Sequence, residues 1–166
     1  ADDVSDIPLV RVDMTGGEIE RIVESALETT PGVIGCNNHM GSRATADRRV
    51  MDAVLRVCGK KDLIFFDSLT TPKSVVREAA AEAGVGTARN DLFLDNRREE
   101  TRENMRKLIS LAIKRGRVTA IMHVRSDSLR DLRWMIGEAA GRGVRFVKLS
   151  EIVKGPVMTA GRGGNS

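Results

Sequence analysis

Short apolar runs alternate with longer amphipathic segments along the sequence, and this alternation constrains the fold more than any other feature. The apolar runs are expected to be strands and lie at residues 33–37, 63–67, 85–89, 118–123 and 145–149. The amphipathic segments carry apolar residues every three or four positions and lie at residues 15–29, 46–57, 71–83, 98–115 and 128–140. Continuously apolar strands suit a parallel sheet covered on both faces, and strand–helix alternation predicts right-handed crossovers. We therefore expect an α/β fold with a parallel-stranded sheet.

Some of the expected helices have recognisable ends. Thr15 and Glu18 have the spacing of a capping box, in which a hydroxyl and a carboxylate bond the first turn reciprocally. Thr71 and Pro72 suit the N-cap and the first turn of a later helix, and Gly84 suits its end. These signals predict where two of the helices begin and where one of them stops.

Length and composition are those of one ordinary globular domain. The chain has 166 residues, 41% of them hydrophobic and 30% charged. We expect a single α/β domain over residues 1–155, with a loop at 91–96, followed by a disordered tail at 156–166. No apolar run approaches the ~20 residues that span a bilayer, so no transmembrane segment is expected. Cys36 falls in an apolar strand and Cys58 near the end of a helix, so both are expected to be buried thiols rather than a disulfide framework.

Charge and aromatic content argue against a nucleic-acid partner. Lys and Arg number 27 and Asp and Glu number 23, which gives a net charge of +4. The basic residues are interleaved with acidic ones, whereas a nucleic-acid footprint needs a concentrated patch. Four Phe, one Trp and no Tyr leave few rings on which bases could stack. We therefore predict that the protein does not bind nucleic acid.

Polar residues directly follow four of the expected strands. They are Asn37, Asn38 and His39 after the first, Asp67 and Ser68 after the second, Arg89 and Asp91 after the third, and His123 after the fourth. The carboxyl ends of parallel strands meet at one edge, where α/β folds carry their functional sites. Because both histidines of the chain lie there, we expect these side chains to gather into one site.

Each of these residues also has a structural interpretation, which the sequence leaves open. His39 could cap the helix that follows it or bond a backbone carbonyl, and His123 could be a structural histidine. Asp67 and the serine after it could form a turn or a helix cap, because both side chains accept backbone N–H groups. Arg89 could simply pair with Asp91.

The chemical interpretation accounts for these residues together. A neutral imidazole can ligate a divalent metal or transfer a proton near neutral pH. A nearby carboxylate can orient the ring, hold the metal or take a proton from water. The side chains of Asn37, Asn38, Ser42 and Arg43 can donate hydrogen bonds to substrate hydroxyls or to a developing oxyanion. This set of groups resembles a hydrolytic site. It does not resemble a nucleotide site, because the chain has no GxGxxG and no GxxxxGKS/T motif.

Three segments and one strand end resemble the divergent polysaccharide deacetylase family. The segments are GCNNHMGSRAT at 35–45, FFDSLTTPKSV at 65–75 and RNDLFLDN at 89–96, and the strand is the one that ends at His123. The resemblance covers about residues 13–153. It implies a distorted or incomplete (β/α) barrel and a glycan substrate or ligand. It also implies a divalent metal, often zinc in that superfamily, and a periplasmic or other extracytoplasmic place in the bacterial envelope.

The resemblance also implies roles for individual residues. His39 falls in the NNHMGS motif and is expected to hold the metal. Asp67 is expected to act in catalysis by orienting or ligating, and His123 by protonating the leaving group. Substrate contacts are expected from Asn37, Asn38, Ser42, Arg43, Ser68, Arg89 and Asp91. The implied reaction is metal-assisted attack of water on an N- or O-acetyl carbonyl of a glycan.

The chain departs from the family pattern in two respects. Family members carry an Asp-Asp pair after their first strand and a further histidine, both upstream of the region matched here, whereas Asp2 and Asp3 follow no strand. A valine also follows His123 where the family usually has proline. Zinc catalysis uses three protein ligands, so we expect the chain to begin inside the family fold and to hold only part of the site.

Two other functions are compatible with the sequence. The first is a non-catalytic envelope module that keeps the fold and binds a glycan or a protein in its cleft. The second is a partial barrel that self-associates, because exposed edges of parallel strands can pair between copies.

Overall fold

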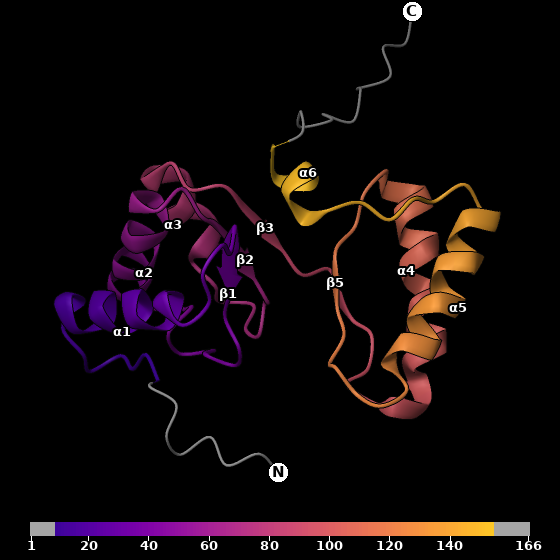
Figure 1. The fold of residues 1–166 in the computed structure, drawn as a ribbon, viewed down its shortest axis with the longest axis horizontal. Coiled ribbons are helices and arrows are strands. Elements are labelled where there is room, and N and C mark those ends of the chain that lie inside the picture. Colours follow the sequence, from indigo (N-terminus) through magenta and orange to yellow (C-terminus); the bar gives the residue numbers. More distant parts are fainter. Residues whose placement is uncertain (1–8, 155–166) are drawn as a thin grey trace, which may run out of the picture.

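The structure, a computed structural model, describes residues 9–154. Two lobes are joined by the extended segment that contains β3 (Thr87–Arg89) and by the segment that runs from α5 (Ser128–Gly141) to α6 (Leu149–Lys154) (Figure 1). The first lobe, residues 9–89, contains α1 (Gly16–Glu28), β1 (Gly35–Asn37), α2 (Arg48–Lys60), β2 (Ile64–Asp67), α3 (Val76–Ala83) and β3 (Thr87–Arg89). The second lobe, residues 90–148, contains β4 (Leu92–Phe93), the 3-10 helix η1 (Arg98–Glu100), α4 (Thr101–Arg115), β5 (Ala120–Ile121) and α5 (Ser128–Gly141). The chain then returns to the first lobe, where α6 (Leu149–Lys154) contacts β3. The tail predicted at 156–166 lies outside the described residues.

The first lobe is a parallel sheet of β1, β2 and β3 with α1, α2 and α3 on one face. Cys36 of β1 lies opposite Phe65 of β2, which lies opposite Thr87 of β3. α2 and α3 are the crossover helices, and α1 packs against α2 (Figure 1). The side chains between the helices and the sheet form one apolar core, whose buried members are Ile19, Val50, Met51, Ala53, Val54, Leu55, Cys58, Leu63, Phe65, Val76, Ala79, Ala80 and Val85.

The helix α6 covers the other face of this sheet. Successive side chains of a strand point to opposite faces, so Ile64 points away from the core that contains Phe65. A Cβ placed on Gly86 would lie 2.7 Å from Cγ1 of Val153 and 3.3 Å from Cγ2 of Ile64. The approach of α6 to the sheet is therefore close enough to require a glycine before β3.

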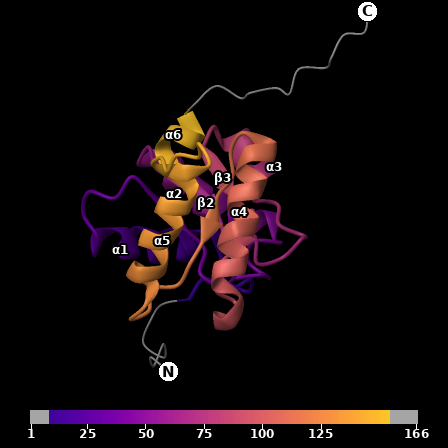
Figure 2. The ribbon, with the colours of Figure 1, turned by 90° about the vertical axis from the view of Figure 1, so that its right-hand side faces the viewer.

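The second lobe has its own apolar core. β4 and β5 pair in parallel, and α4 makes the crossover between them. α4 and α5 lie side by side over these strands (Figure 2). The guanidinium carbons of Arg102 and Arg106 each lie 5.1 Å from the ring centroid of Trp134, which ties the two helices at their surface. The buried core residues of this lobe are Leu94, Met105, Leu108, Ile109, Met135 and Ala139.

One segment, Thr87 to Phe93, takes part in both sheets. The N–H of Asn90 donates to the carbonyl of Asp67 in the first lobe, at 2.8 Å. The N–H of the next residue, Asp91, donates to the carbonyl of Thr119 in the second lobe, at 3.0 Å. The strands of residues 9–154 therefore form a parallel array that changes partner at this point and does not close into a barrel.

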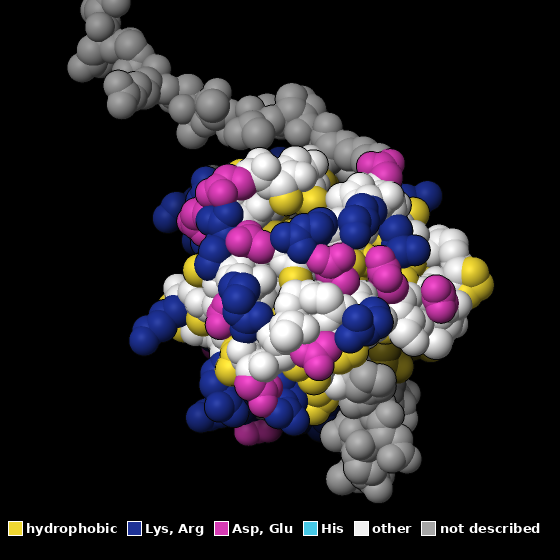
Figure 3. Space-filling view, turned by 90° about the vertical axis from the view of Figure 1, so that its left-hand side faces the viewer, with side chains coloured by type: hydrophobic (Ala, Val, Ile, Leu, Met, Phe, Trp, Pro, Cys, Tyr) yellow, Lys and Arg dark blue, Asp and Glu magenta, His cyan; other side chains and the backbone are white. Residues whose placement is uncertain are grey.

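The surface of the first lobe carries both signs of charge. Figure 3 shows Lys and Arg side chains interspersed with Asp and Glu on the face turned to the viewer. On the helices of this lobe, Glu20 pairs with Arg56 and with Lys60, and Arg48 pairs with Glu82. Within the described part of the chain, no helix is long and apolar enough to cross a bilayer.

The helices agree with the sequence prediction better than the strands do. The capping box is present, with Thr15 N–H donating to Glu18 at 2.7 Å and Glu18 N–H donating to Thr15 at 3.3 Å. The third helix, however, begins at Val76 and not near residue 72, because the segment before it is bent into a loop that Asp67 holds.

One loop prediction and one strand prediction were wrong. The loop expected at 91–96 contains β4, which the partner β5 stabilises. The strand expected at 145–149 is absent from the described residues. Residues 145–148 pair with no strand, Phe146 and Val147 are exposed, and Leu149 begins α6. An apolar run forms a strand only where a neighbouring strand can bond its backbone.

Gly35→Ala tests the close contact between β1 and β2. A Cβ at Gly35 would contact Cγ1 of Ile64 and lie 2.6 Å from its carbonyl oxygen, so backbone must move. We expect this variant to lose about 1–3 kcal/mol of unfolding free energy, measured by urea unfolding. Gly137→Ala is the matched control, because a Cβ there meets nothing within 4 Å on helix α5. It should gain up to about 1 kcal/mol, and equal losses in both variants would contradict the packing argument.

Candidate functional site

The polar residues after β1 and β2 bond one another. The N–H of Ser68 donates to Oδ1 of Asn38 at 2.8 Å, and the Ser68 hydroxyl donates to the Asn38 carbonyl at 2.6 Å. Nδ2 of Asn37 donates to Oγ of Ser68 at 3.1 Å. These contacts, together with those of Ser42 and Thr70, form what we call the β1–β2 loop network. The predicted gathering of strand ends is thus correct for these two strands.

The same network fixes a tight turn in the loop after β1. Nδ2 of Asn38 donates to the Met40 carbonyl at 2.9 Å, which also accepts the Thr70 hydroxyl at 3.0 Å. The Ser42 hydroxyl donates to the Thr70 carbonyl at 3.1 Å. Met40 and Gly41 both have left-handed backbones, with φ of 55° and 77°. A methionine rarely adopts this conformation, so the hydrogen bonds offset local strain.

Asp67 shapes the loop after β2. Its side chain is buried, with 4% of the residue exposed. Oδ1 accepts the N–H of Leu69 at 2.8 Å, and Oδ2 accepts the hydroxyl of Ser74 at 2.7 Å. Leu69 has a left-handed backbone with φ of 51°. These contacts match the turn interpretation of Asp67, and its catalytic role stays a prediction.

His39 and Arg43 project from the loop after β1. Both are exposed, and their side chains have no hydrogen-bond partner within residues 9–154. A metal centre at His39 would need further ligands of the His, Cys, Asp or Glu type. In the part of the chain that the structure describes, no group of three or more such residues could hold a metal ion. The described residues therefore do not fit the predicted metal.

A second polar cluster lies at the carboxyl end of β5. Nδ1 of His123 lies 2.9 Å from Oδ1 of Asp95, and the His123 N–H lies 3.1 Å from both oxygens of that carboxylate. Nε of Arg125 donates to Oδ2 of Asp95 at 3.1 Å. The Ser128 hydroxyl donates to the His123 carbonyl at 2.8 Å and accepts the Arg125 N–H at 2.9 Å. We call His123, Asp95 and Arg125 the histidine–carboxylate cluster.

Burial and charge act on Asp95 in opposite directions. The residue is 3% exposed, and burial alone raises the pKa of its carboxyl group. The hydrogen bonds from the ring and backbone of His123 and from Arg125 lower it, and the net pKa lies below the ordinary value. The carboxylate is therefore ionised at neutral pH and can orient a His123 ring whose side chain is 43% exposed.

Arg89 and Asp91 do not pair with each other. Asp91 accepts Nη1 of Arg115 at 3.2 Å and the Thr119 N–H at 2.9 Å. Thr119 precedes β5, whereas His123 follows it, so Asp91 lies at the opposite end of that strand from the histidine. Arg89 is exposed at the end of β3. The substrate-binding roles of both residues stay predictions.

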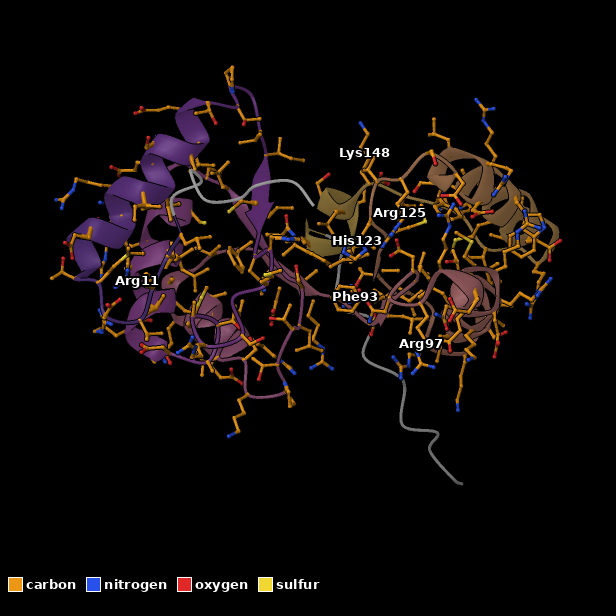
Figure 4. All side chains as sticks on the ribbon, turned by 90° about the horizontal axis from the view of Figure 1, so that it is seen from below. Arg11, Phe93, Arg97, His123, Arg125 and Lys148 are labelled. Atoms are coloured by element: carbon orange, nitrogen blue, oxygen red, sulfur yellow. The ribbon has the colours of Figure 1, made fainter. Side chains whose placement is uncertain are left out.

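The strand ends thus form two polar groups rather than the single one expected. Figure 4 shows His123 and Arg125 near the middle of the molecule, with Arg11 far away in the first lobe. The described residues supply no hydrogen bond between the histidine–carboxylate cluster and the β1–β2 loop network. The split follows from the partner change at Asn90, which assigns β4 and β5 to a separate sheet.

The sequence prediction missed Asp95 and Arg125. The signal for Asp95 was present, because the apolar run Leu92-Phe93-Leu94 ends in this acidic residue as the other strands end in polar ones. The run is too short to be recognised as a strand from its period alone. No pattern in the sequence indicated that Arg125 bonds the same carboxylate.

Asp95→Asn should make the unfolding free energy depend less on pH in acid. Because the pKa of Asp95 is lower in the folded protein than in the unfolded chain, its ionised form stabilises the fold above the unfolded value of about 4. That stabilisation is lost as the pH falls through the folded pKa. The wild-type unfolding free energy should therefore drop more steeply than that of Asp95→Asn as the pH falls below about 5. Urea unfolding at several pH values measures both slopes.

Glu138→Gln is the control for this comparison. Glu138 is an exposed carboxylate on α5 with no ion pair to any residue in the range 9–154. The pH dependence of the unfolding free energy of Glu138→Gln should have the same slope as that of the wild type. An Asp95→Asn slope as steep as the wild-type slope would show that ionisation of Asp95 does not stabilise the fold.

Comparisons with known proteins agree with this fold. The profile of the family described as divergent polysaccharide deacetylase matches residues 8–153. The chain is 32% identical over 149 residues to the uncharacterized protein YibQ of Escherichia coli K12, covering 89% of this chain and 46% of YibQ. It is 34% identical over 122 residues to an uncharacterized protein of Haemophilus influenzae, covering 72% of this chain and 44% of that protein. The chain spans about half the length of these curated relatives.

A solved structure shares the fold. The crystal structure of an uncharacterized protein from Agrobacterium tumefaciens C58 matches with a TM-score of 0.68 at 24% identity, over 72% of this chain and 50% of that one. The profile match extends over nearly all of the described residues, and YibQ exceeds 30% identity. The chain therefore belongs to the divergent polysaccharide deacetylase family.

Proposed function

We propose that this chain is part of a hydrolase that removes acyl groups from a glycan, with His123 as the proton donor. The observation that carries the proposal is the bond between Nδ1 of His123 and the buried carboxylate of Asp95. This bond fixes the ring and leaves Nε2 as the nitrogen that can exchange a proton with a substrate. Family membership supports the glycan as the class of substrate.

The histidine–carboxylate cluster has the properties of a general acid. When water adds to an acyl carbonyl, the amine or alcohol that departs needs a proton as the carbon–nitrogen or carbon–oxygen bond breaks. Nε2 of a protonated His123 can supply it, while Asp95 holds the ring in place through Nδ1. Arg125 holds the second oxygen of Asp95 and so keeps the carboxylate turned toward the ring.

In this proposal, the metal ligands come from outside the described residues. The divalent metal that the resemblance implies would need ligands that residues 9–154 do not assemble. The chain spans about half of its curated relatives, which supports a site completed by other parts of a longer protein. The β1–β2 loop network, with the exposed residues His39 and Arg43, would then form a second wall of the site.

The free strand edges support a larger assembly. Within the described residues, β1 pairs only with β2, and β5 pairs only with β4. Unpaired edges are covered in stable proteins. We propose that further strands complete a (β/α) barrel, supplied by the remaining part of a longer chain or by a second copy, and that the protein works in the bacterial envelope.

Acetate release from N- and O-acetylated glycans by the longer protein, with the remaining part of the chain restored, tests the enzymatic proposal. In assays with and without added Zn²⁺, His123→Ala should lower kcat by about 100-fold or more, as expected for loss of a general acid. Asp95→Asn should lower kcat more than it changes KM, because the substitution alters how the His123 ring is held and not how the substrate is bound. Asn96→Ala is the matched control, since Asn96 is exposed beside Asp95 in the chain.

Unchanged acetate release by His123→Ala would contradict the assignment of the proton donor. If no acetylated glycan is hydrolysed but glycan is bound equally by wild type and His123→Ala, the non-catalytic binding module is the better description. That alternative draws on one observation, which is that residues 9–154 form no metal site.

A further inference from the structure

The two cysteines of the chain face each other inside the first lobe. Sγ of Cys36 on β1 lies 3.7 Å from Sγ of Cys58 on α2, although 22 positions separate them in the sequence. Both thiols belong to the core between β1 and α2. A disulfide has its sulfur atoms about 2.05 Å apart, so a small shift of β1 toward α2 would bring the pair to bonding distance.

The two thiols differ in accessibility and in reactivity. Cys58 is fully buried, with 0% of its surface exposed, whereas Cys36 is partly exposed on β1. The hydrogen bond between the two thiols lowers the pKa of Cys36, and the same bond together with burial raises the pKa of Cys58. The thiolate is the nucleophile in disulfide exchange, so Cys36 is the thiol that meets an oxidant first.

We propose that Cys36 and Cys58 oxidise to a disulfide within the folded protein when they meet a small disulfide oxidant. In the first step the Cys36 thiolate attacks one sulfur of the oxidant, forms a mixed disulfide and releases one thiolate. In the second step Cys58 loses its proton and attacks Sγ of Cys36, which releases the second thiolate. The two cysteines lose two electrons and two protons, and the oxidant becomes two thiols.

The position of the bond gives it a structural consequence. Cys36 directly precedes Asn37, whose side chain bonds Ser68 in the β1–β2 loop network. β1 is paired on one side only within residues 9–154, so its place depends on β2 and on the core beneath it. A disulfide to α2 would attach this strand covalently and hold the start of the loop that carries His39. This inference does not depend on the proposed enzymatic activity.

Mass spectrometry of the folded protein tests the proposal. The protein is incubated with oxidised glutathione without denaturant, then unfolded and treated with iodoacetamide. We expect the mass of the treated wild type to be lower by two hydrogen atoms than that of the reduced, unalkylated protein. Neither thiol should be alkylated, and no glutathione should be attached. A wild type that keeps two free thiols, or that retains glutathione on Cys36, would overturn the proposal.

Single variants separate the two steps. Cys58→Ala should stop at a glutathione adduct on Cys36, because the resolving thiol is gone. Cys36→Ser should carry no glutathione, because Cys58 is fully buried in the folded protein, and its Cys58 should be alkylated only after unfolding. Rapid modification of Cys58 in the Cys36→Ser variant would show that the pair opens in solution and would overturn the order of attack.

Thermal unfolding gives an independent readout of the same bond. Closing a loop between residues 22 positions apart constrains the unfolded chain, so oxidation should raise Tm by about 5–10 °C. The double variant Cys36→Ser/Cys58→Ala should show no response to oxidised glutathione. A wild-type Tm unchanged after complete oxidation would show that the bond does not stabilise the fold.

Discussion

The backbone of Asn90 and Asp91 is the constraint on which the rest of the structure depends. One N–H of this pair bonds β2 in the first lobe, and the next bonds the residue before β5 in the second lobe. The continuous segment from Thr87 to Phe93 thereby belongs to two sheets, each with its own helices and its own apolar core. All neighbouring strands remain parallel, so the carboxyl ends of both sheets carry the loops with polar residues.

This partner change determines which polar residues meet. Asn37, Asn38 and Ser68 follow adjacent strands of one sheet, and they satisfy one another's hydrogen bonds. His123 follows a strand of the other sheet, where its neighbour in space is Asp95 at the end of β4. The first group mainly holds two loops in shape, whereas the second has a partly exposed imidazole backed by a buried, ionised carboxylate. Only the second arrangement has the form of an acid–base site.

Sequence periodicity predicted the helices well because their signals are local. A capping box or a glycine stop acts within one turn, and the amphipathic period repeats within each helix. Strands depend on partners elsewhere in the chain, and here the predictions were less accurate. The run at 145–149 is apolar but meets no strand, while the short run Leu92-Phe93 became β4 because β5 lies beside it. The loop before Val76 follows from the distant bond between Asp67 and Ser74.

The sequence by itself determined the α/β class, the alternation of parallel strands with helices, most helix positions and the family. Each of these depends on local periods or on motifs. It also placed polar residues at the strand ends. Only the tertiary structure decided which strands became neighbours, and therefore that His123 is paired with Asp95 and that Cys36 faces Cys58. The physical reason is that hydrogen bonds and packing between distant segments depend on strand order, which no local pattern in the chain encodes.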